Sequence, residues 1–296
     1  MGSQMALGQN PPQNMKIACV GDVGIDYYKN LGLLKPGGIA FNFAYNLRGL
    51  GIKSVSLISV LGNDRFSKKL FNLLKSIEIN ASHVQKLSGN SPKQNIFLGK
   101  GERKFTGYEA GVLKKWKLRK KDRDFIKKQD AIFVPLSDGM EHIFNDVKKI
   151  NGPIKAVDFS QDYEFADFDK KESVITKNAK YFDVIFIGGE KKYEKAVQVL
   201  AKQYLRKVFI LTLGKDGSIA YHEGIKILQP AYKIKKVVDT TGCGDAFQAA
   251  FLASWLENKN IKTALIKGAK RAADIIKTVG STPFNFKMKN IIKIKE

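Results

Sequence analysis

The sequence predicts an α/β protein with a doubly wound, mostly parallel sheet flanked by helices, and a small β-sheet lid. Short β-branched runs alternate along the chain with segments of helical periodicity. Several runs are apolar almost throughout, which is typical of parallel strands whose sheet is covered on both faces. One region breaks this alternation with two strand-like runs around a glycine turn, and it predicts the lid.

Each main-sheet strand is expected where an apolar run ends in glycine or a polar residue. These runs are 16–22, 54–60, 130–135, 154–160, 183–188 and 208–214. Helices are expected from Gly38 to about Leu50, from Asn63 or Asp64 onward, and over 190–205, each with a polar or glycine start. In such sheets ligands bind beyond the carboxyl ends of the strands, so the polar residues that follow the strands predict the site.

The lid is expected from segments 24–36 and 93–112, the second of which folds as a hairpin around "GKGE". Residues 15–296 are interpreted as one domain. Residues 1–14 carry no charged side chain and no long apolar run, which is unlike a signal peptide, so a disordered leader or tag is predicted there.

Composition limits the functional classes. Two cysteines, Cys19 and Cys243, form no C-x-x-C pattern, which fits a reducing cytoplasm rather than a disulfide or zinc protein. No apolar run is long enough for a membrane helix. The formal charge of +23 favours anionic ligands or nucleic acid. Most of the excess is lysine scattered along the chain, which indicates a solvated surface, so nucleic acid is not the expected partner.

The stretch "VVDTTGCGDAFQAAFL", 237–252, predicts an anion site at the start of a buried helix. Glycine leaves backbone N–H groups uncovered, and unpaired N–H groups at a helix start attract phosphate. Asp245 in the first turn is placed to deprotonate an alcohol that attacks a γ-phosphate. Read alone, the same stretch is also compatible with a plain glycine turn.

At these residues the sequence resembles the ribokinase-like (PfkB) carbohydrate kinases, whose C-terminal signature is D-T-x-G-A/C-G-D. The stretch 239–245, "DTTGCGD", matches it throughout. The resemblance implies ATP as phosphoryl donor, Asp245 as catalytic base, and an anion hole in the backbone of Gly242, Cys243 and Gly244. It also implies Thr240 near the nucleotide, and Asp239 and Thr241 near a monovalent cation, K⁺.

Further segments resemble the family in the same order, over about residues 16–284. "GDVGIDYY" and "GGIAFNFAYN" imply an acceptor site, and "TLGKDGS" and "GAKRAADIIK" imply a nucleotide site. The implied acceptor residues are Asp22, Asp26, Gly37, Gly38 and Asn42, and the implied nucleotide residues are Thr212, Gly214, Gly217, Gly268, Ala272 and Ala273. The glycines also suit ordinary turns, and the alanines suit ordinary helix packing.

One departure concerns Mg²⁺. Many members of the family carry N-x-x-E after the strand that corresponds to 183–188, whereas this chain has "IGGEKKYE" there. Either Glu190 substitutes from a neighbouring position and binds Mg²⁺ through water, or the metal is held mainly by ATP oxygens.

For the acceptor, "KFTGYEAGV" and "AVDFS" resemble the fructoselysine 6-kinase and fructokinase-like subgroup. This implies a sugar or fructosamine with a primary hydroxyl. Aromatic residues of the lid such as Phe105 and Tyr108 could stack on a sugar or form the core of the lid. Arg103 could pair with a carboxylate of the acceptor or occupy an ordinary surface position.

Alternatives are ribokinase- or nucleoside-kinase-like specificity, and a non-catalytic nucleic-acid-binding protein on a kinase scaffold. "GDVGID" has the wrong spacing for a dinucleotide-binding turn. Lids in this family also form dimer contacts, so a homodimer through the lid is among the expected partners.

Overall fold

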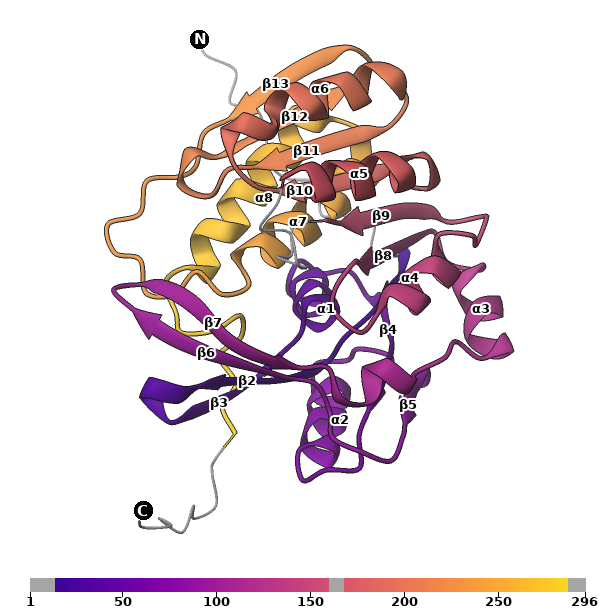
Figure 1. Ribbon diagram of the computed structural model, residues 1–296, viewed down its shortest axis with the longest axis vertical. Coiled ribbons are helices and arrows are strands. Elements are labelled where there is room, and N and C mark those ends of the chain that lie inside the picture. Colours follow the sequence, from indigo (N-terminus) through magenta and orange to yellow (C-terminus); the bar gives the residue numbers. More distant parts are fainter. Residues whose placement is uncertain (1–13, 160–167, 287–296) are drawn as a thin grey trace.

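The main body of the protein is a nine-stranded sheet, seen in a computed structural model that describes residues 14–159 and 168–286 (Figure 1). The strand order is β13-β12-β11-β10-β9-β8-β1-β4-β5. All neighbours from β5 to β11 are parallel, while β12 and β13 are antiparallel additions at one edge. The strands are β1 (Lys16–Val20), β4 (Ser54–Leu61), β5 (Val84–Lys86), β8 (Ala131–Pro135), β9 (Ile154–Asp158), β10 (Val184–Gly188), β11 (Val208–Thr212), β12 (Ser218–His222) and β13 (Ile225–Gln229).

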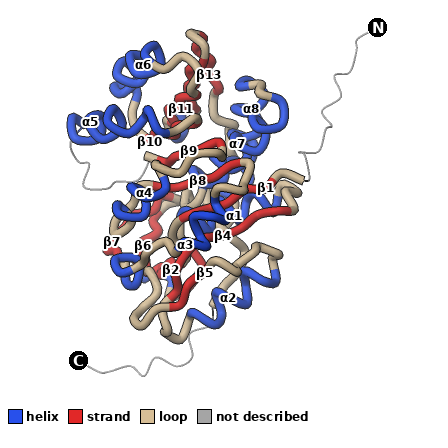
Figure 2. Tube along the Cα trace, turned by 90° about the vertical axis from the view of Figure 1, so that its right-hand side faces the viewer, coloured by secondary structure: helices blue, strands red, loops and turns tan. Residues whose placement is uncertain are grey.

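Helices cover both faces of this sheet, as the two sides of Figure 2 show for α5 and α6 against α7 and α8. One face carries α1 (Ile39–Gly49), α2 (Ser67–Ser76), α7 (Cys243–Asn258) and α8 (Ile261–Ile275); the other carries α3 (Lys120–Ile126), α4 (Glu141–Val147), α5 (Phe168–Asn178) and α6 (Glu194–Gln203). Alternate strand residues enter the two cores, so in β1 Ile17 and Cys19 pack on the first face and Ala18 and Val20 on the second. Apolar residues are therefore required at nearly every strand position.

The lid is a separate four-stranded sheet with the order β3-β2-β6-β7. It consists of β2 (Gly24–Tyr28), β3 (Leu33–Gly37), β6 (Lys93–Gly99) and β7 (Glu102–Glu109), and it projects beside the main body in Figure 1. The chain near its C-terminal end runs along the free edge of this sheet, where the Phe286 amide donates to the Leu34 carbonyl at 2.8 Å. The predicted fold class and lid are confirmed.

Two helix starts differ from the sequence-based prediction. The helix expected from Asn63 or Asp64 begins at Ser67, with Phe66 as its N-cap residue. It follows a turn in which Asp64 Oδ1 accepts hydrogen bonds from the amides of Phe66 and Ser67. The helix expected over 190–205 spans only Glu194–Gln203, after a 3₁₀ turn over Lys191–Tyr193. The predicted leader lies outside the described residues except for Asn14, and the single-domain interpretation stays a prediction.

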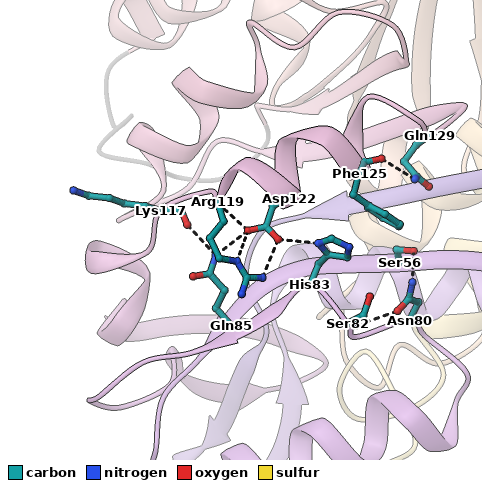
Figure 3. Close-up of polar contacts among 10 residues, drawn as sticks. All are labelled: Ser56, Asn80, Ser82, His83, Gln85, Lys117, Arg119, Asp122, Phe125 and Gln129. Carbon is teal, nitrogen blue, oxygen red and sulfur yellow. Dashed lines mark hydrogen bonds and ion pairs between the residues drawn. The ribbon is translucent and has the colours of Figure 1, made fainter.

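A buried carboxylate away from the lid ties β5 to α3 (Figure 3). Asp122 lies between Arg119 and His83 and accepts hydrogen bonds from both, at 2.8 Å from His83 Nδ1 and from Arg119 Nε. Gln85 Nε2 donates to the same carboxylate at 3.1 Å. These hydrogen bonds hold the pKa of Asp122 at about 2, against the opposing effect of burial. The cluster anchors the edge of the sheet that bears β5.

Candidate active site

A cavity of about 770 Å³ lies where the predicted acceptor residues and the 239–245 loop meet under the lid. Its walls come from the carboxyl ends of β1 and β9, the start of α1, the lid strands and the start of α7. The lining includes ten of the predicted residues, namely Asp22, Asp26, Gly38, Asn42, Arg103, Thr240, Thr241, Gly242, Gly244 and Asp245. Residues far apart in the sequence thus converge on one chamber of a size typical of small-molecule sites.

The start of α7 provides the uncovered amides that the sequence predicted. Gly242 precedes the helix in a left-handed conformation with φ of 80°, and a Cβ there would lie 2.4 Å from the Cβ of Ser281. Gly244 has open space around it, and among the described residues no acceptor is assigned to the amides of Gly244 or Asp245. These amides, at the positive end of a 16-residue helix, are suited to bind a phosphoryl oxygen, and this role stays a prediction. Burial raises the pKa of the Cys243 thiol to about 12, which disfavours a thiolate. The Cys243 amide, predicted as part of the anion hole, donates to the Thr240 carbonyl at 3.3 Å, so it is not among the uncovered amides.

Asp245 reaches the cavity from the first turn of α7, with one carboxylate oxygen held. Its Oδ2 accepts a hydrogen bond from Asn42 Nδ2 at 2.7 Å. Burial raises the pKa of Asp245 to about 8, partly offset by the Asn42 hydrogen bond. No cation pairs with this carboxylate in the described part of the chain. A carboxyl with a pKa near neutrality, held at the wall of a cavity, is suited to accept a proton from an alcohol.

Asn42 orients the Asp245 carboxylate as well as lining the cavity. Its Oδ1 accepts a hydrogen bond from Ser281 Oγ at 2.6 Å, which fixes the amide so that Nδ2 faces Asp245. Behind it, Asn46 Nδ2 donates to the Asn42 carbonyl at 2.8 Å, and Arg271 Nε donates to Asn46 Oδ1 at 2.7 Å. The sequence predicted Asn42 only as an acceptor-site residue, and nothing in its spacing indicated Ser281, Asn46 or Arg271.

Asp22 and Asp26 contribute two further carboxyl groups to the cavity lining. Asp22 Oδ1 accepts from the Ala40 amide at 3.2 Å, and Asp22 and Asp26 are each 6% exposed. Burial raises the pKa of both carboxyl groups, that of Asp26 to about 7. Carboxyl groups of this kind accept or donate hydrogen bonds, as sugar hydroxyls require.

Asp239 does not face the cavity; it is fully buried beneath the loop. Its Oδ1 accepts from the Thr241 amide and hydroxyl at 2.9 and 2.8 Å, and its Oδ2 accepts from Tyr28 Oη and the Gly280 amide, both at 2.7 Å. These four donors engage both oxygens. The side chain of Asp239 therefore does not fit the predicted role of a ligand to a monovalent cation in this structure, and the role of Thr241 stays a prediction.

Arg103 crosses from the lid to the loop. Its Nη1 donates to the carbonyl oxygen and to Oγ1 of Thr240, at 2.8 and 2.9 Å. The guanidinium thus lies beside the 239–245 loop, and pairing with an acceptor carboxylate stays a prediction.

Of the predicted nucleotide residues, Thr240 lines the cavity, whereas Thr212, Gly214, Gly217, Gly268 and Ala272 lie outside its lining. Thr212 ends β11, and Gly217 has φ of 96° with no room for a Cβ, which would lie 2.1 Å from the Gln229 carbonyl. Gly268 has a packing role, since a Cβ there would lie 2.9 Å from the Phe247 ring where α8 crosses α7. The roles of Thr212, Gly214, Gly217, Gly268 and Ala272 in binding ATP stay predictions.

Magnesium has no preformed cage in the described part of the chain, where no three His, Cys, Asp or Glu residues are grouped as metal ligands. Glu190 pairs with Lys192 at 3.1 Å and is largely exposed. Both predicted alternatives, a magnesium ion bound through Glu190 and one held mainly by ATP oxygens, stay predictions.

Two cavity residues were not predicted as acceptor-site hydrogen-bond partners. The Tyr108 hydroxyl and Ser137 Oγ are buried in the lining without a partner among the described residues. The sequence indicated Tyr108 only for its aromatic ring. No sequence pattern indicated Ser137, because this residue lies in a loop whose position depends on the neighbouring strands. Buried hydroxyls without partners at a cavity wall are suited to bind substrate hydroxyls.

The comparison with protein families shows to which family of enzymes the chain belongs. Residues 17–141 and 173–287 match the model of the pfkB family carbohydrate kinases. The chain belongs to this family, and it is a phosphotransferase with an alcohol group as acceptor. The fold is ribokinase-like.

Individual relatives agree over nearly the whole chain. It is 28% identical over 280 residues to fructosamine kinase FrlD of Bacillus subtilis (strain 168), covering 92% of this chain and 94% of that one. It is 27% identical over 269 residues to fructoselysine 6-kinase of Escherichia coli (strain K12), covering 90% and 98%. The crystal structure of Methanocaldococcus jannaschii nucleoside kinase superimposes with a TM-score of 0.73 at 23% identity, covering 92% and 94%. No helix in the described residues is long and apolar enough to cross a membrane.

Proposed function

We propose that the protein transfers the γ-phosphate of ATP to a primary hydroxyl of a fructosamine or a related ketose. The observation that carries the proposal is the position of Asp245 at the wall of the cavity, next to the uncovered amides that begin α7. An alcohol in the cavity meets the base and the phosphoryl site together. The two relatives named as fructosamine and fructoselysine kinases support the acceptor class.

The chemistry needs few groups. Asp245 accepts the proton of the attacking hydroxyl late in the reaction, while the uncovered amides of Gly244 and Asp245 at the helix terminus stabilise the charge on the transferring phosphoryl group. Asn42 holds the carboxylate facing the acceptor. Mg²⁺ bound to ATP supplies further charge neutralisation when present. Positioning by the lid and the loop contributes the remainder of the rate enhancement.

The charge of the cavity supports an acceptor that carries an amine. The lining holds six acidic residues (Asp22, Asp26, Glu102, Asp138, Asp158 and Asp245) and three basic ones (Lys93, Arg103 and Lys104). The cavity is therefore acidic within a chain of formal charge +23. A protonated secondary amine, as in a fructosamine, would favour the ionised forms of these carboxyl groups. A cytoplasmic location and a homodimer through the lid remain predictions.

A coupled ADP-release assay tests the acceptor. The panel is fructoselysine, a second fructosamine with a neutral side chain, fructose, ribose and a nucleoside. We expect the fructosamines to have the highest kcat/KM. Turnover confined to the nucleoside or to ribose would contradict the proposed acceptor class and leave the phosphotransferase class intact.

Replacement of the base tests the mechanism. Asp245→Asn is expected to bind a non-hydrolysable ATP analogue as the wild type does and to lose turnover by about 10²–10⁴-fold. The variant should be at least as stable as the wild type at neutral pH. Burial raises the pKa of Asp245 from 3.8 to about 8, so the free energy of unfolding of the wild type declines as the pH rises from 3.8 to about 8 and then levels off, whereas Asp245→Asn lacks this contribution. Titration calorimetry and thermal unfolding provide these controls. Turnover within tenfold of the wild type would exclude Asp245 as the base.

A further inference from the structure

A buried lysine on the lid lies beneath the loop that forms the phosphoryl site. Lys35, on β3, is 3% exposed, although lysine is almost never fully buried without a partner. Its Nζ donates to Asn285 Oδ1 at 2.8 Å, and within residues 14–159 and 168–286 no other hydrogen bond or ion pair of the ammonium is assigned. The burial of this charge is therefore not explained by a direct ion pair.

The stem of Lys35 supports the turn at Gly280 and Ser281. A Cβ on Gly280 would lie 2.3 Å from Cε and 2.6 Å from Cδ of Lys35, so the lysine occupies the space that a side chain would need there. Gly280 has φ of 75°, and its amide donates to Asp239 Oδ2 at 2.7 Å.

The same turn contacts the phosphoryl site from below. The Cα of Gly242 lies against Ser281, and Ser281 Oγ donates to Asn42, which holds Asp245. A displacement of the 280–281 turn would therefore move both the start of α7 and the base. Lys35 is linked to the reacting groups through this single turn.

The charges around Lys35 complete the arrangement. Asp26 is its direct partner across the β2–β3 pair, where opposed side chains lie within about 5.5 Å at Cβ. Burial lowers the pKa of Lys35, while the negative charges of Asp239 and Asp26 act in the opposite direction. The ammonium thus provides positive charge, from inside the protein, near the two buried carboxyl groups of Asp26 and Asp239.

We propose that Lys35 is a fixed internal cation that neutralises Asp239 and holds the 280–281 turn in the position that sets the phosphoryl-binding amides. It is a positioning residue, and it takes the role that the family resemblance assigns to a free monovalent cation. This agrees with the complete set of donors around Asp239. The proposal depends on the kinase class and not on the identity of the acceptor.

The first test measures the cation dependence of the wild-type protein. Thermal unfolding, affinity for a non-hydrolysable ATP analogue, and turnover with the best acceptor are measured in tetramethylammonium chloride, with K⁺ exchanged in at constant ionic strength. We expect the nucleotide affinity and the turnover to change by less than about twofold. The midpoint of thermal unfolding should change by less than about 2 °C. An increase in turnover or nucleotide affinity of about tenfold or more on adding K⁺ would overturn the proposal. The unfolding and nucleotide measurements need no acceptor, so an error in the acceptor class would not affect them.

The second test removes the ammonium. Lys35→Met keeps the apolar stem over Gly280, and it is expected to lower kcat by about 10²-fold while changing the KM of the acceptor much less. Lys35→Ala is expected to regain activity and thermal stability with ammonium, methylammonium or K⁺ ions, which fit the vacated space. Lys29→Met, at an exposed lysine of the same lid connection, is the control and should behave as the wild type.

Two results would contradict the role of Lys35. One is a folded Lys35→Met variant with kcat within twofold of the wild type. The other is a loss of activity in Lys35→Ala that no small cation restores, which would indicate a purely structural contribution. If both variants fail to fold, the cation dependence of the wild type still decides the question.

Discussion

The ionisation of Asp245 should control the pH profile. Its pKa is raised to about 8 by burial, and only the ionised form accepts a proton. We therefore expect kcat/KM for the acceptor to rise about tenfold per pH unit below pH 8 and then to level off. Initial rates across this range measure it. Asp26→Asn is the control, because Asp26 also has a raised pKa, of about 7. In this variant the rise of kcat/KM below pH 8 that is assigned to Asp245 should remain. A flat profile would contradict the assignment.

Gly242 and Gly244 should differ in what they tolerate. Gly242→Ala places a Cβ against Ser281 at a residue with φ of 80°, and such strain costs about 1–3 kcal/mol. Gly244→Ala meets open space, so its effect on the unfolding free energy should stay within about 0.5 kcal/mol. Thermal or denaturant unfolding of the two variants provides the comparison. Equal stability of both would show that the loop adjusts more readily than its geometry indicates.

Among the elements, β5 and α3 depend on one buried carboxylate. Asp122→Ala leaves Arg119 and His83 without their shared partner. We expect the free energy of unfolding to fall by about 3 kcal/mol, which is the lower end of the range for a broken buried ion pair. The lower end applies because Arg119 is partly exposed. The pKa of Asp122 is lowered to about 2, so its contribution is present above the ordinary value of 3.8 and lost as the pH falls through about 2.

Urea unfolding at neutral and acidic pH measures this contribution. Asp146→Ala is the matched control, since its ion pair with Arg123 lies on the surface and should contribute at most about 1 kcal/mol. Kinetic constants should be unchanged in both variants, because neither residue lines the cavity. A shift in the KM of the acceptor in Asp122→Ala would show that the edge of the sheet is coupled to the site.

The charge of the whole molecule should affect the two substrates differently. With a formal charge of +23, the protein attracts ATP over distances comparable to the Debye length, about 8 Å at physiological salt. We expect kcat/KM for ATP to fall as KCl is raised, and kcat/KM for a neutral sugar acceptor to change much less. Initial rates from low to high salt test this. If kcat/KM for both substrates fell equally with salt, the salt would act on the folded enzyme rather than on its association with ATP.

Much of the fold and part of the site could be predicted from local patterns. The six main strands were found because a run covered on both faces must be apolar at each position. Three strands of the main sheet were missed, namely β5, β12 and β13. The first has only three residues and the last is largely exposed, so neither gives a long apolar run, whereas β12 is buried and was missed nonetheless. The start of α2 was misplaced because Asp64, a residue type common at helix starts, instead accepts hydrogen bonds from the Phe66 and Ser67 amides in the turn that precedes the helix.

The sequence by itself determined the alternation of strands and helices, the lid hairpin, and the glycine-rich start of α7 with Asp245 in its first turn. These follow from periodicity and backbone freedom, which act over a few residues. Only the tertiary structure decided that Asn42 and Ser281 orient Asp245, that Asp239 is saturated by donors, and that Lys35 lies beneath the loop. These contacts join residues that lie tens to hundreds of positions apart, and side chains at such separations meet only once the sheet, the lid and the C-terminal segment have packed together.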